Sequence, residues 1–267
     1  MKLLKLIIIS LSMLATSNLV FAAGGGNKNL DEVHIDMGDK ASLQNGAKLF
    51  VNYCLSCHGA AYSRYERVAA DLDIPLSHLK ENMMFTTDKA GDLMTVSMSE
   101  KDGKEWFGVA PPDLTVVSRV RKPNWVYTYL RSFYRDESTP SGWNNALFSN
   151  VAMPHVMYEL QGAPKLISLP GADSAEHKTD KHDDAHAAKA DESTYTAGGA
   201  VFDMSHRGKL SNAEFDSEMR DLTNFLVYLA EPAQMQRKKI GVWTLAFLII
   251  FMLLAIVLKK EYWRDIH

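Results

Sequence analysis

The feature that most constrains this chain is the pentapeptide Cys54-Leu55-Ser56-Cys57-His58, which contains both cysteines of the 267-residue sequence. On a helix, residues three and four positions apart share a face, so both thiols and the imidazole would point the same way. The C-x-x-C-H spacing is typical of c-type haem attachment. Two thiols can add to the two vinyl groups of a haem, and the adjoining imidazole then reaches the iron.

Three other roles for this motif compete with haem attachment. A thioredoxin-type pair needs a low-pKa thiolate in a βαβ context, whereas apolar residues recur at helical spacing before the motif (Leu43, Ala47, Phe50). A zinc site needs four ligands, and the sequence has no second cysteine pair. A disulfide between Cys54 and Cys57 leaves the histidine unexplained. We therefore predict one covalently attached haem c.

A haem iron held by His58 has a sixth position, which methionine fills in many electron-transfer cytochromes. Met153 is followed by Pro154, which disfavours helix at Met153 and predicts an irregular loop. A loop presents its side chain to a cofactor more readily than a packed helix does. From the residues alone, Met153 leads Met157 only modestly, and His155 is a competitor.

Two apolar segments indicate export and membrane anchoring. Residues 1–22 have a basic start, an apolar stretch and a small-residue cleavage pattern, as a cleaved signal peptide does, with an uncleaved anchor as the alternative. Residues 240–258 are 19 positions without a charge. As a helix they would be about 28 Å long, enough to cross a bilayer. We expect a transmembrane helix with its flank at 237–259 and a cytoplasmic tail at 260–267.

Three basic residues lie on either side of the span, so the positive-inside rule does not decide its orientation. The export signal does, because it sends the part of the chain before the span across the membrane. Residues 23–236 would then form a periplasmic haem domain, anchored by a single pass in the inner membrane. A mitochondrial intermembrane space is the second choice. The whole chain has a formal net charge of −3 at pH 7, and the exported part is more acidic. This charge balance argues against a nucleic-acid partner.

A histidine-rich stretch of low complexity, at about 171–192, interrupts the exported part. Its histidines are His177, His182 and His186, spaced four and five residues apart without apolar support. We expect a solvated surface insertion, with metal chelation as the alternative.

Beyond the pentapeptide, an ordered set of motifs resembles the cytochrome c1 family, the haem subunits of cytochrome bc1 complexes. The resemblance runs from about residue 43 to the C-terminus. Its motifs are Asn45-Gly46-Ala47, Tyr62-Ser63-Arg64-Tyr65, Pro111-Pro112-Asp113-Leu114, Asn150-Val151-Ala152-Met153-Pro154, Glu159-Leu160-Gln161-Gly162, and Glu231-Pro232 followed by Arg237-Lys238. Many cytochromes share C-x-x-C-H, but this ordered set with one C-terminal anchor is more specific.

The resemblance implies how a haem would be held. Cys54 and Cys57 would carry the thioether bonds. His58 and Met153 would be the axial ligands of the iron, which favours Met153 over Met157.

The resemblance also implies three contacts around the haem. Pro111 or Pro112 would pack on the imidazole side, where a backbone carbonyl can orient the ring N–H. Arg121 would pair with a haem propionate, with Arg119 as the alternate. Trp125 falls near an aromatic position beside the propionate, although an ordinary core tryptophan is equally compatible with the sequence.

The implied function is electron relay. The chain would pass single electrons from a Rieske iron–sulfur protein to a soluble or membrane-bound cytochrome c, within a dimeric complex whose quinol chemistry belongs to cytochrome b. It would thus be an electron-transfer subunit of a quinol–cytochrome c reductase, without substrate bond chemistry of its own, and its anchor would contact membrane lipid. The alternatives are a monohaem cytochrome of a different reductase or oxidase, an anchored thiol–disulfide oxidoreductase, and a structural or metal-binding protein acting through the histidine-rich stretch.

The predicted fold is mostly α: a class I c-type cytochrome-like domain with long irregular loops and one C-terminal transmembrane helix. Asn124 is expected to cap a helix whose apolar face carries Val126, Tyr129, Leu130 and Phe133. Little of the sequence alternates like a sheet, so segments 59–110 and 135–170 are expected to be irregular.

A second predicted helix lies just before the membrane. Ser211 and Glu214 form a capping-box pattern. They precede a long apolar stripe of Phe215, Met219, Leu222, Phe225, Leu226 and Leu229, which Pro232 ends. We expect this helix to pack across the cysteine-bearing helix.

Overall fold

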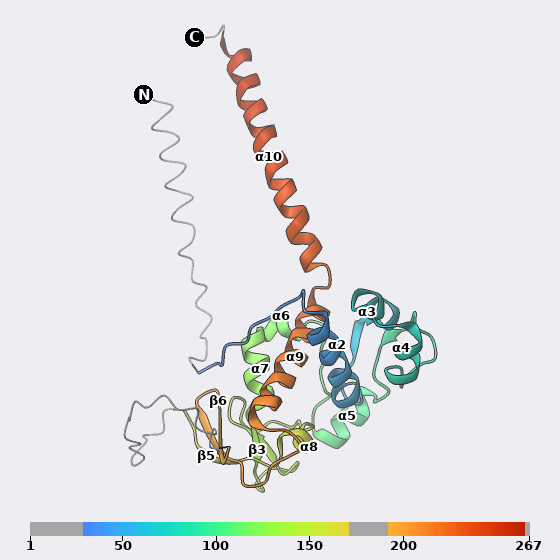
Figure 1. The fold of residues 1–267 in the computed structure, drawn as a ribbon, viewed down its shortest axis with the longest axis vertical. Coiled ribbons are helices and arrows are strands. Elements are labelled where there is room, and N and C mark those ends of the chain that lie inside the picture. Colours follow the sequence, from blue (N-terminus) through green and yellow to red (C-terminus); the bar gives the residue numbers. More distant parts are fainter. Residues whose placement is uncertain (1–28, 171–191, 265–267) are drawn as a thin grey trace.

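The computed structural model describes residues 29–170 and 192–264, so the expected signal peptide and nearly all of the histidine-rich insertion lie outside the described residues. Helices dominate the described residues, and three small antiparallel sheets accompany the helices there (Figure 1). One long helix, α10, extends away from the domain that the other elements form. The predicted mostly helical class with a single C-terminal apolar helix is confirmed.

Helix α2 (Lys40–Leu49) carries the cysteine motif at its C-terminal end. The Asp39 carboxylate caps its start by accepting a hydrogen bond from the Ser42 N–H at 3.0 Å. The helix then widens into a π-turn, η2 (Phe50–Cys54), in which the Leu55 N–H donates to the Phe50 carbonyl at 3.0 Å. π-turns inside helices are frequent at functional sites.

Helix α9 (Asn212–Ala230) crosses α2 and forms the centre of the core. Both hydrogen bonds of the predicted capping box at Ser211 and Glu214 are present, and all six residues of the predicted apolar stripe are buried. Burying each large apolar side chain contributes about 1.5–3 kcal/mol. The expectation that this helix packs across the cysteine-bearing helix is confirmed.

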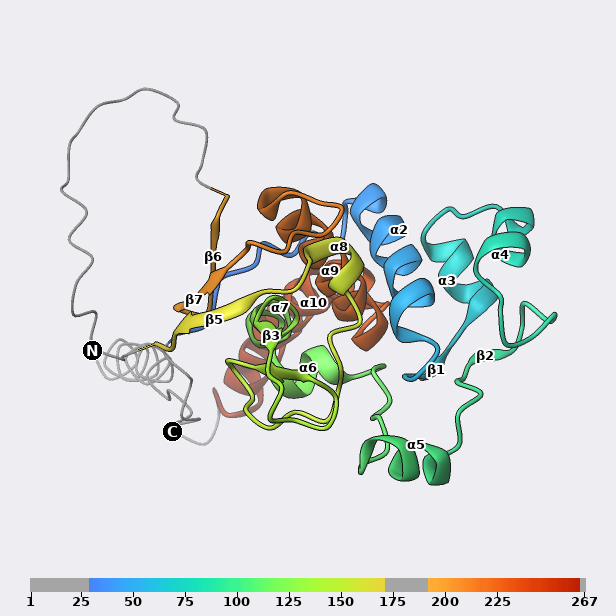
Figure 2. The ribbon, with the colours of Figure 1, turned by 90° about the horizontal axis from the view of Figure 1, so that it is seen from below.

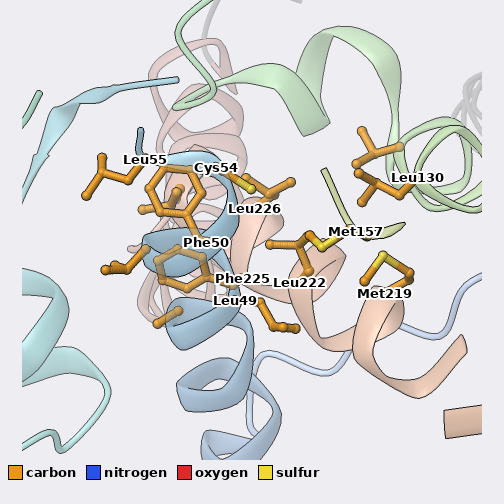
Figure 3. Close-up of a cluster of buried hydrophobic side chains, with 14 of the residues drawn as sticks. Leu49, Phe50, Cys54, Leu55, Leu130, Met157, Met219, Leu222, Phe225 and Leu226 are labelled. Carbon is orange, nitrogen blue, oxygen red and sulfur yellow. The ribbon is translucent and has the colours of Figure 1, made fainter. Parts of the chain in front are cut away.

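The crossing of α2 and α9 is close because Gly46 lies at the contact. A Cβ atom on Gly46 would lie 2.1 Å from the Asp221 carbonyl oxygen and 2.6 Å from the Phe225 Cβ. Beyond the glycine, the Phe50 and Phe225 rings pack with centroids 5.6 Å apart. Figure 3 shows these two rings between the helices, with Cys54 beside Leu226.

The predicted irregularity of 59–110 and 135–170 is only partly correct. The first segment contains α3 (Tyr65–Asp71), α4 (Leu76–Asn82), α5 (Glu100–Phe107), and the paired strands β1 (Ala60–Arg64) and β2 (Leu93–Met94). The second contains part of β3 (Phe133–Arg135), β4 (Trp143–Asn145), α8 (Tyr158–Gln161) and β5 (Lys165–Ser168). These elements are too short to show a clear period in the sequence.

Strand β5 belongs to a three-stranded sheet in the order β5-β7-β6, with β6 (Thr194–Ala197) and β7 (Ala200–Asp203). Figure 2 shows this sheet and the α3–α4 pair on opposite sides of the central helices. This sheet therefore lies beside the α2–α9 core.

Helix α7 (Pro123–Arg131) follows the short helix α6 (Val117–Arg121) and differs from the prediction at both ends. Lys122 occupies the N-cap position without a side-chain cap, and Pro123 is the first helical residue. Proline has a preset φ and suits that place. The Asn124 side chain instead accepts a hydrogen bond from the Val33 N–H at 3.2 Å, so its predicted capping role is wrong. Phe133 lies in β3, not in the helix.

Helix α10 (Gln234–Tyr262) contains the predicted span 240–258. By length and composition its 29 residues could cross a membrane, and none of its side chains is buried. At its foot, the Glu231 carboxylate accepts from Arg237 and pairs with Arg119 of α6 at 3.3 Å. This carboxylate connects the helical domain to the start of the long helix.

Candidate haem-binding site

A cavity of about 430 Å³ lies between the end of η2, the helices α6, α7 and α9, and two loops at 107–114 and 148–156. Most of its lining is apolar. All seven predicted site residues line it: Cys54, Cys57, His58, Pro111, Pro112, Arg121 and Met153. The fold thus brings together residues that are almost a hundred positions apart in the sequence.

The two thiols are held by a turn that continues the helix. The His58 and Cys57 N–H groups donate to the Cys54 carbonyl at 2.8 and 3.0 Å. The thiols are not bridged to each other. Burial raises the pKa of Cys54 to about 12, so this thiol is protonated at neutral pH. A redox nucleophile needs the opposite shift, which argues against the thioredoxin-type alternative.

The His58 ring is oriented by a backbone carbonyl. Its Nδ1 lies 2.7 Å from the Pro112 oxygen, and because a carbonyl can only accept, Nδ1 carries the proton. The lone pair of Nε2 is therefore available to a metal ion. Burial lowers the pKa of His58, which favours the neutral imidazole that a metal requires.

The loop that supplies this carbonyl is tied to the chain that follows the motif. One carboxylate oxygen of Asp113 accepts from the Ala61 N–H at 2.7 Å, and the other accepts from the Thr115 N–H at 2.9 Å. The Leu114 N–H donates to the Gly59 carbonyl at 2.8 Å. These bonds fix Pro112 beside the imidazole.

Met153 also lines this cavity and lies in an irregular segment before Pro154. Among the residues that the structure describes, it is the only methionine in the lining. Met157 is 1% exposed and packs in the core, as Figure 3 shows. His155 is 2% exposed and lies between the Phe133 ring, which stacks on it, and the edge of Trp143. Of the three candidates that the residues left open, only Met153 faces the cavity.

Arg121 lies at the cavity with its guanidinium 4.9 Å from the centroid of Trp125, which also lines the cavity. Within 29–170 and 192–264 it has no carboxylate partner, whereas Arg119 pairs with Glu231 at 3.3 Å and is not part of the lining. Arg121 is therefore better placed than Arg119 to meet an acidic group of a ligand.

Sequence reasoning missed Tyr129 as a site residue and assigned it to a core face. Its ring lines the cavity, and its hydroxyl donates a hydrogen bond to Met153 Sδ at 3.4 Å. Burial raises the pKa of Tyr129 well above its usual value. The four-residue spacing of Trp125 and Tyr129 within α7 was the available signal, because such residues lie on one helix face.

No group of three or more His, Cys, Asp and Glu side chains that could hold a metal ion occurs in the described ranges. This observation does not favour the zinc alternative for the cysteine motif. The loop at 171–191 lies outside those ranges, so metal chelation by its histidines is untested.

Comparisons with known proteins relate this chain to one family. A model of the Cytochrome C1 family matches residues 208–266. The chain is 44% identical over 263 residues to a cytochrome c1 of Allochromatium vinosum, covering 98% of this chain and 99% of that protein. It is 39% identical over 267 residues to a Nitrosomonas europaea protein named ammonia monooxygenase gamma subunit, covering 100% of both. A cytochrome c1 of Rhodospirillum rubrum is 25% identical over 252 residues, covering 85% of this chain and 83% of that protein.

The similarity to the Allochromatium vinosum protein extends over nearly the whole of both chains, including the cavity and the long C-terminal helix. The match to the family model covers the region from just before α9 through α10. This chain belongs to the cytochrome c1 family.

Proposed function

We propose that this chain is the membrane-anchored monohaem subunit of a respiratory cytochrome bc1 complex, which relays single electrons from a Rieske iron–sulfur protein to a cytochrome c. One observation carries the proposal. The same mostly apolar cavity is lined by both thiols, by an imidazole with a free Nε2, and by the methionine Met153.

The residues present fit one covalently attached haem c. Cys54 and Cys57 would hold it, and His58 and Met153 would be its axial ligands. When bound, the haem supplies a one-electron Fe(III)/Fe(II) couple. The Pro112 carbonyl keeps the imidazole proton on Nδ1, and the thioether of Met153 is a soft ligand that favours the reduced ion.

The surroundings suit electron transfer at a controlled potential. The Arg121 guanidinium lies over the ring of Trp125. It could pair there with a propionate of the haem. Pro111 and Pro112 form the wall on the imidazole side. The apolar lining, which includes Leu222 and Leu226 of α9, excludes water and so lowers the dielectric constant around any charge in the cavity.

The anchor would hold this domain within a larger assembly. Helix α10 would span the inner membrane once, with residues 23–236 in the periplasm after cleavage of residues 1–22, and with 260–267 in the cytoplasm. Tethering keeps the haem near its donor, so effective concentration replaces free diffusion. Cytochrome b would carry out the quinol chemistry in the same dimeric complex.

The proposal is tested on the complex purified from detergent-solubilised membranes. We expect cytochrome b and the Rieske protein to copurify with this chain, and a pyridine haemochrome spectrum to give one c-type haem per copy. Haem staining on a denaturing gel should label this chain and should weaken strongly in Cys57→Ser. A chain without haem, or undiminished staining in Cys57→Ser, would contradict the proposal.

A second candidate is the same haem domain in another oxidoreductase. The similarity to a protein named ammonia monooxygenase gamma subunit is the observation that favours it. Both candidates predict haem and a membrane anchor, so a spectrum alone does not separate them. Copurification with an oxidoreductase that lacks cytochrome b would favour the second.

A further inference from the structure

We propose that the Tyr129 hydroxyl tunes the redox potential of the site by donating a hydrogen bond to the sulfur of the methionine ligand. This inference rests on the proposed function, in which Met153 ligates the iron. Tyr129 acts through Met153 and is therefore a positioning residue.

The hydrogen bond is held by a stack of side chains from α7 and from its neighbours in the chain, α6 and β3. The rings of Trp125 and Tyr129 are parallel to within 10°, with centroids 4.9 Å apart, and the Phe133 ring meets Tyr129 edge-on at 5.2 Å. Arg121 lies on the other side of Trp125. The Tyr129 ring is thus fixed on both sides, and its hydroxyl lies 3.4 Å from Met153 Sδ.

The stack also reaches the loop that carries the methionine. Phe133 stacks on His155, with centroids 5.2 Å apart and ring planes within 9°. His155 is only two positions after Met153 and is almost fully buried. The aromatic residues therefore control both partners of the hydrogen bond, the hydroxyl from α7 and the sulfur from the loop.

The chemistry of a thioether allows both contacts at once. The sulfur has two lone pairs, so one can bind iron while the other accepts the hydrogen bond from the Tyr129 hydroxyl. A hydrogen bond to the sulfur draws electron density from it and makes it a weaker donor to the oxidised ion. The oxidised state is then less stable relative to the reduced state, and the midpoint potential is higher than with an unbonded sulfur.

Tyr129→Phe in the full-length protein within its complex tests this inference. Phenylalanine keeps the ring between Trp125 and Phe133 and removes only the hydroxyl. We expect attached haem and the methionine-to-iron charge-transfer band to remain. We expect the reduced-to-oxidised ratio at a fixed ambient potential to fall by about three- to tenfold, the size of one weak hydrogen bond. Tyr127→Phe is the matched control, since that hydroxyl is on the same helix but outside the lining.

Added imidazole separates tuning from simple support of the loop. If the hydroxyl weakens the sulfur as a donor, its loss strengthens the sulfur ligand that imidazole must displace. Oxidised Tyr129→Phe should then bind imidazole several-fold more weakly than the oxidised wild type. If the hydroxyl only anchored the loop, its loss would free the position and imidazole would bind more tightly.

An unchanged potential in Tyr129→Phe, or tighter imidazole binding, would overturn the inference while leaving the proposed function intact. A wild-type protein with haem but without the methionine-to-iron band would overturn both the ligand assignment and the inference.

Discussion

Met153 is the side chain on which the potential of the proposed site depends most. It lines the same cavity as His58, whereas Met157, four positions later, is buried in the core. We expect Met153→Leu to retain covalently attached haem, because the thioether bonds involve other residues. Its midpoint potential should fall sharply, because the soft ligand that favours the reduced ion is lost.

A redox titration of the purified complex measures this effect, with Met157→Leu as the control. That substitution conserves volume in the core and should leave the potential near the wild-type value. A wild-type potential in Met153→Leu would remove Met153 as a ligand.

At the scale of residues, the sequence predicted best which side chains come together where they are close in the chain. The spacing of Cys54, Cys57 and His58 places all three at one cavity, and Pro154 explains why Met153 lies in a loop. Prediction failed for Asn124, whose side chain bonds to the distant Val33 N–H. The role of Tyr129 was missed because its spacing from Trp125 shows a shared helix face but not that this face meets the distant loop that carries Met153.

At the scale of elements, the crossing of α2 and α9 determines how close the cysteine helix lies to the core. Gly46 permits that approach, since a Cβ there would overlap the backbone of Asp221. We expect Gly46→Ala to reduce the free energy of unfolding by about 1–3 kcal/mol, the usual range for overpacking. Lys48→Ala, at an exposed position on the same helix, is the control.

Denaturant unfolding of the haem-loaded protein measures the difference between these variants. Equal stability of Gly46→Ala and the wild type would mean that the helices separate at no cost, which contradicts the close packing described here.

The capping box of α9 makes a contribution to stability that depends on pH. Hydrogen bonds from the Ser211 N–H and hydroxyl, both 2.8 Å, lower the pKa of Glu214. A carboxyl with a lowered pKa stabilises the fold above its unfolded pKa of about 4.3, and this contribution is lost as pH falls through the folded value. Glu214→Gln should therefore be less stable than the wild type at pH 7.

That difference should shrink toward pH 3, where Glu214 is protonated in both states. Unfolding curves at the two pH values check the sign, and Ser211→Ala should remove about 1 kcal/mol by loss of the cap. A difference between Glu214→Gln and the wild type that grows on acidification would be inconsistent with the capping box.

The length of an element decided how well it could be predicted. The stripe of α9 and the uncharged run of α10 extend over several turns, so their periodicity or composition is unmistakable. Strands such as β2, with two residues, have no room for alternation. Their pairing depends on tertiary contacts, which the sequence pattern alone does not contain.

For the whole molecule, the described domain and its anchor are separable. None of the side chains of α10 is buried, so the core does not depend on that helix. We expect a chain that ends before residue 240 to retain Arg237 and its bond to Glu231, and to fold around haem. Ultracentrifugation of a cell lysate should find it in the supernatant with its haem spectrum intact.

The full-length chain should sediment with membranes in the same experiment. Recovery of the truncated chain in the membrane pellet would point to an uncleaved N-terminal segment or to retention by partner subunits, and would contradict a single C-terminal anchor. At this scale the sequence predicted a mostly helical fold with a C-terminal apolar helix. The cavity, which residues from distant loops line together, could be seen only in the folded structure.

The π-turn at Phe50–Cys54 changes the direction in which the side chains that follow it point. Each residue of an α-helix advances the side-chain direction by about 100°, and a π-turn accommodates one additional residue within the helix. The turn therefore rotates the side chains that follow it around the helix axis. As a result Phe50 is buried in the core, while Cys54 and Cys57 line the cavity. The single inserted position therefore sets which residues of the cysteine motif line the cavity.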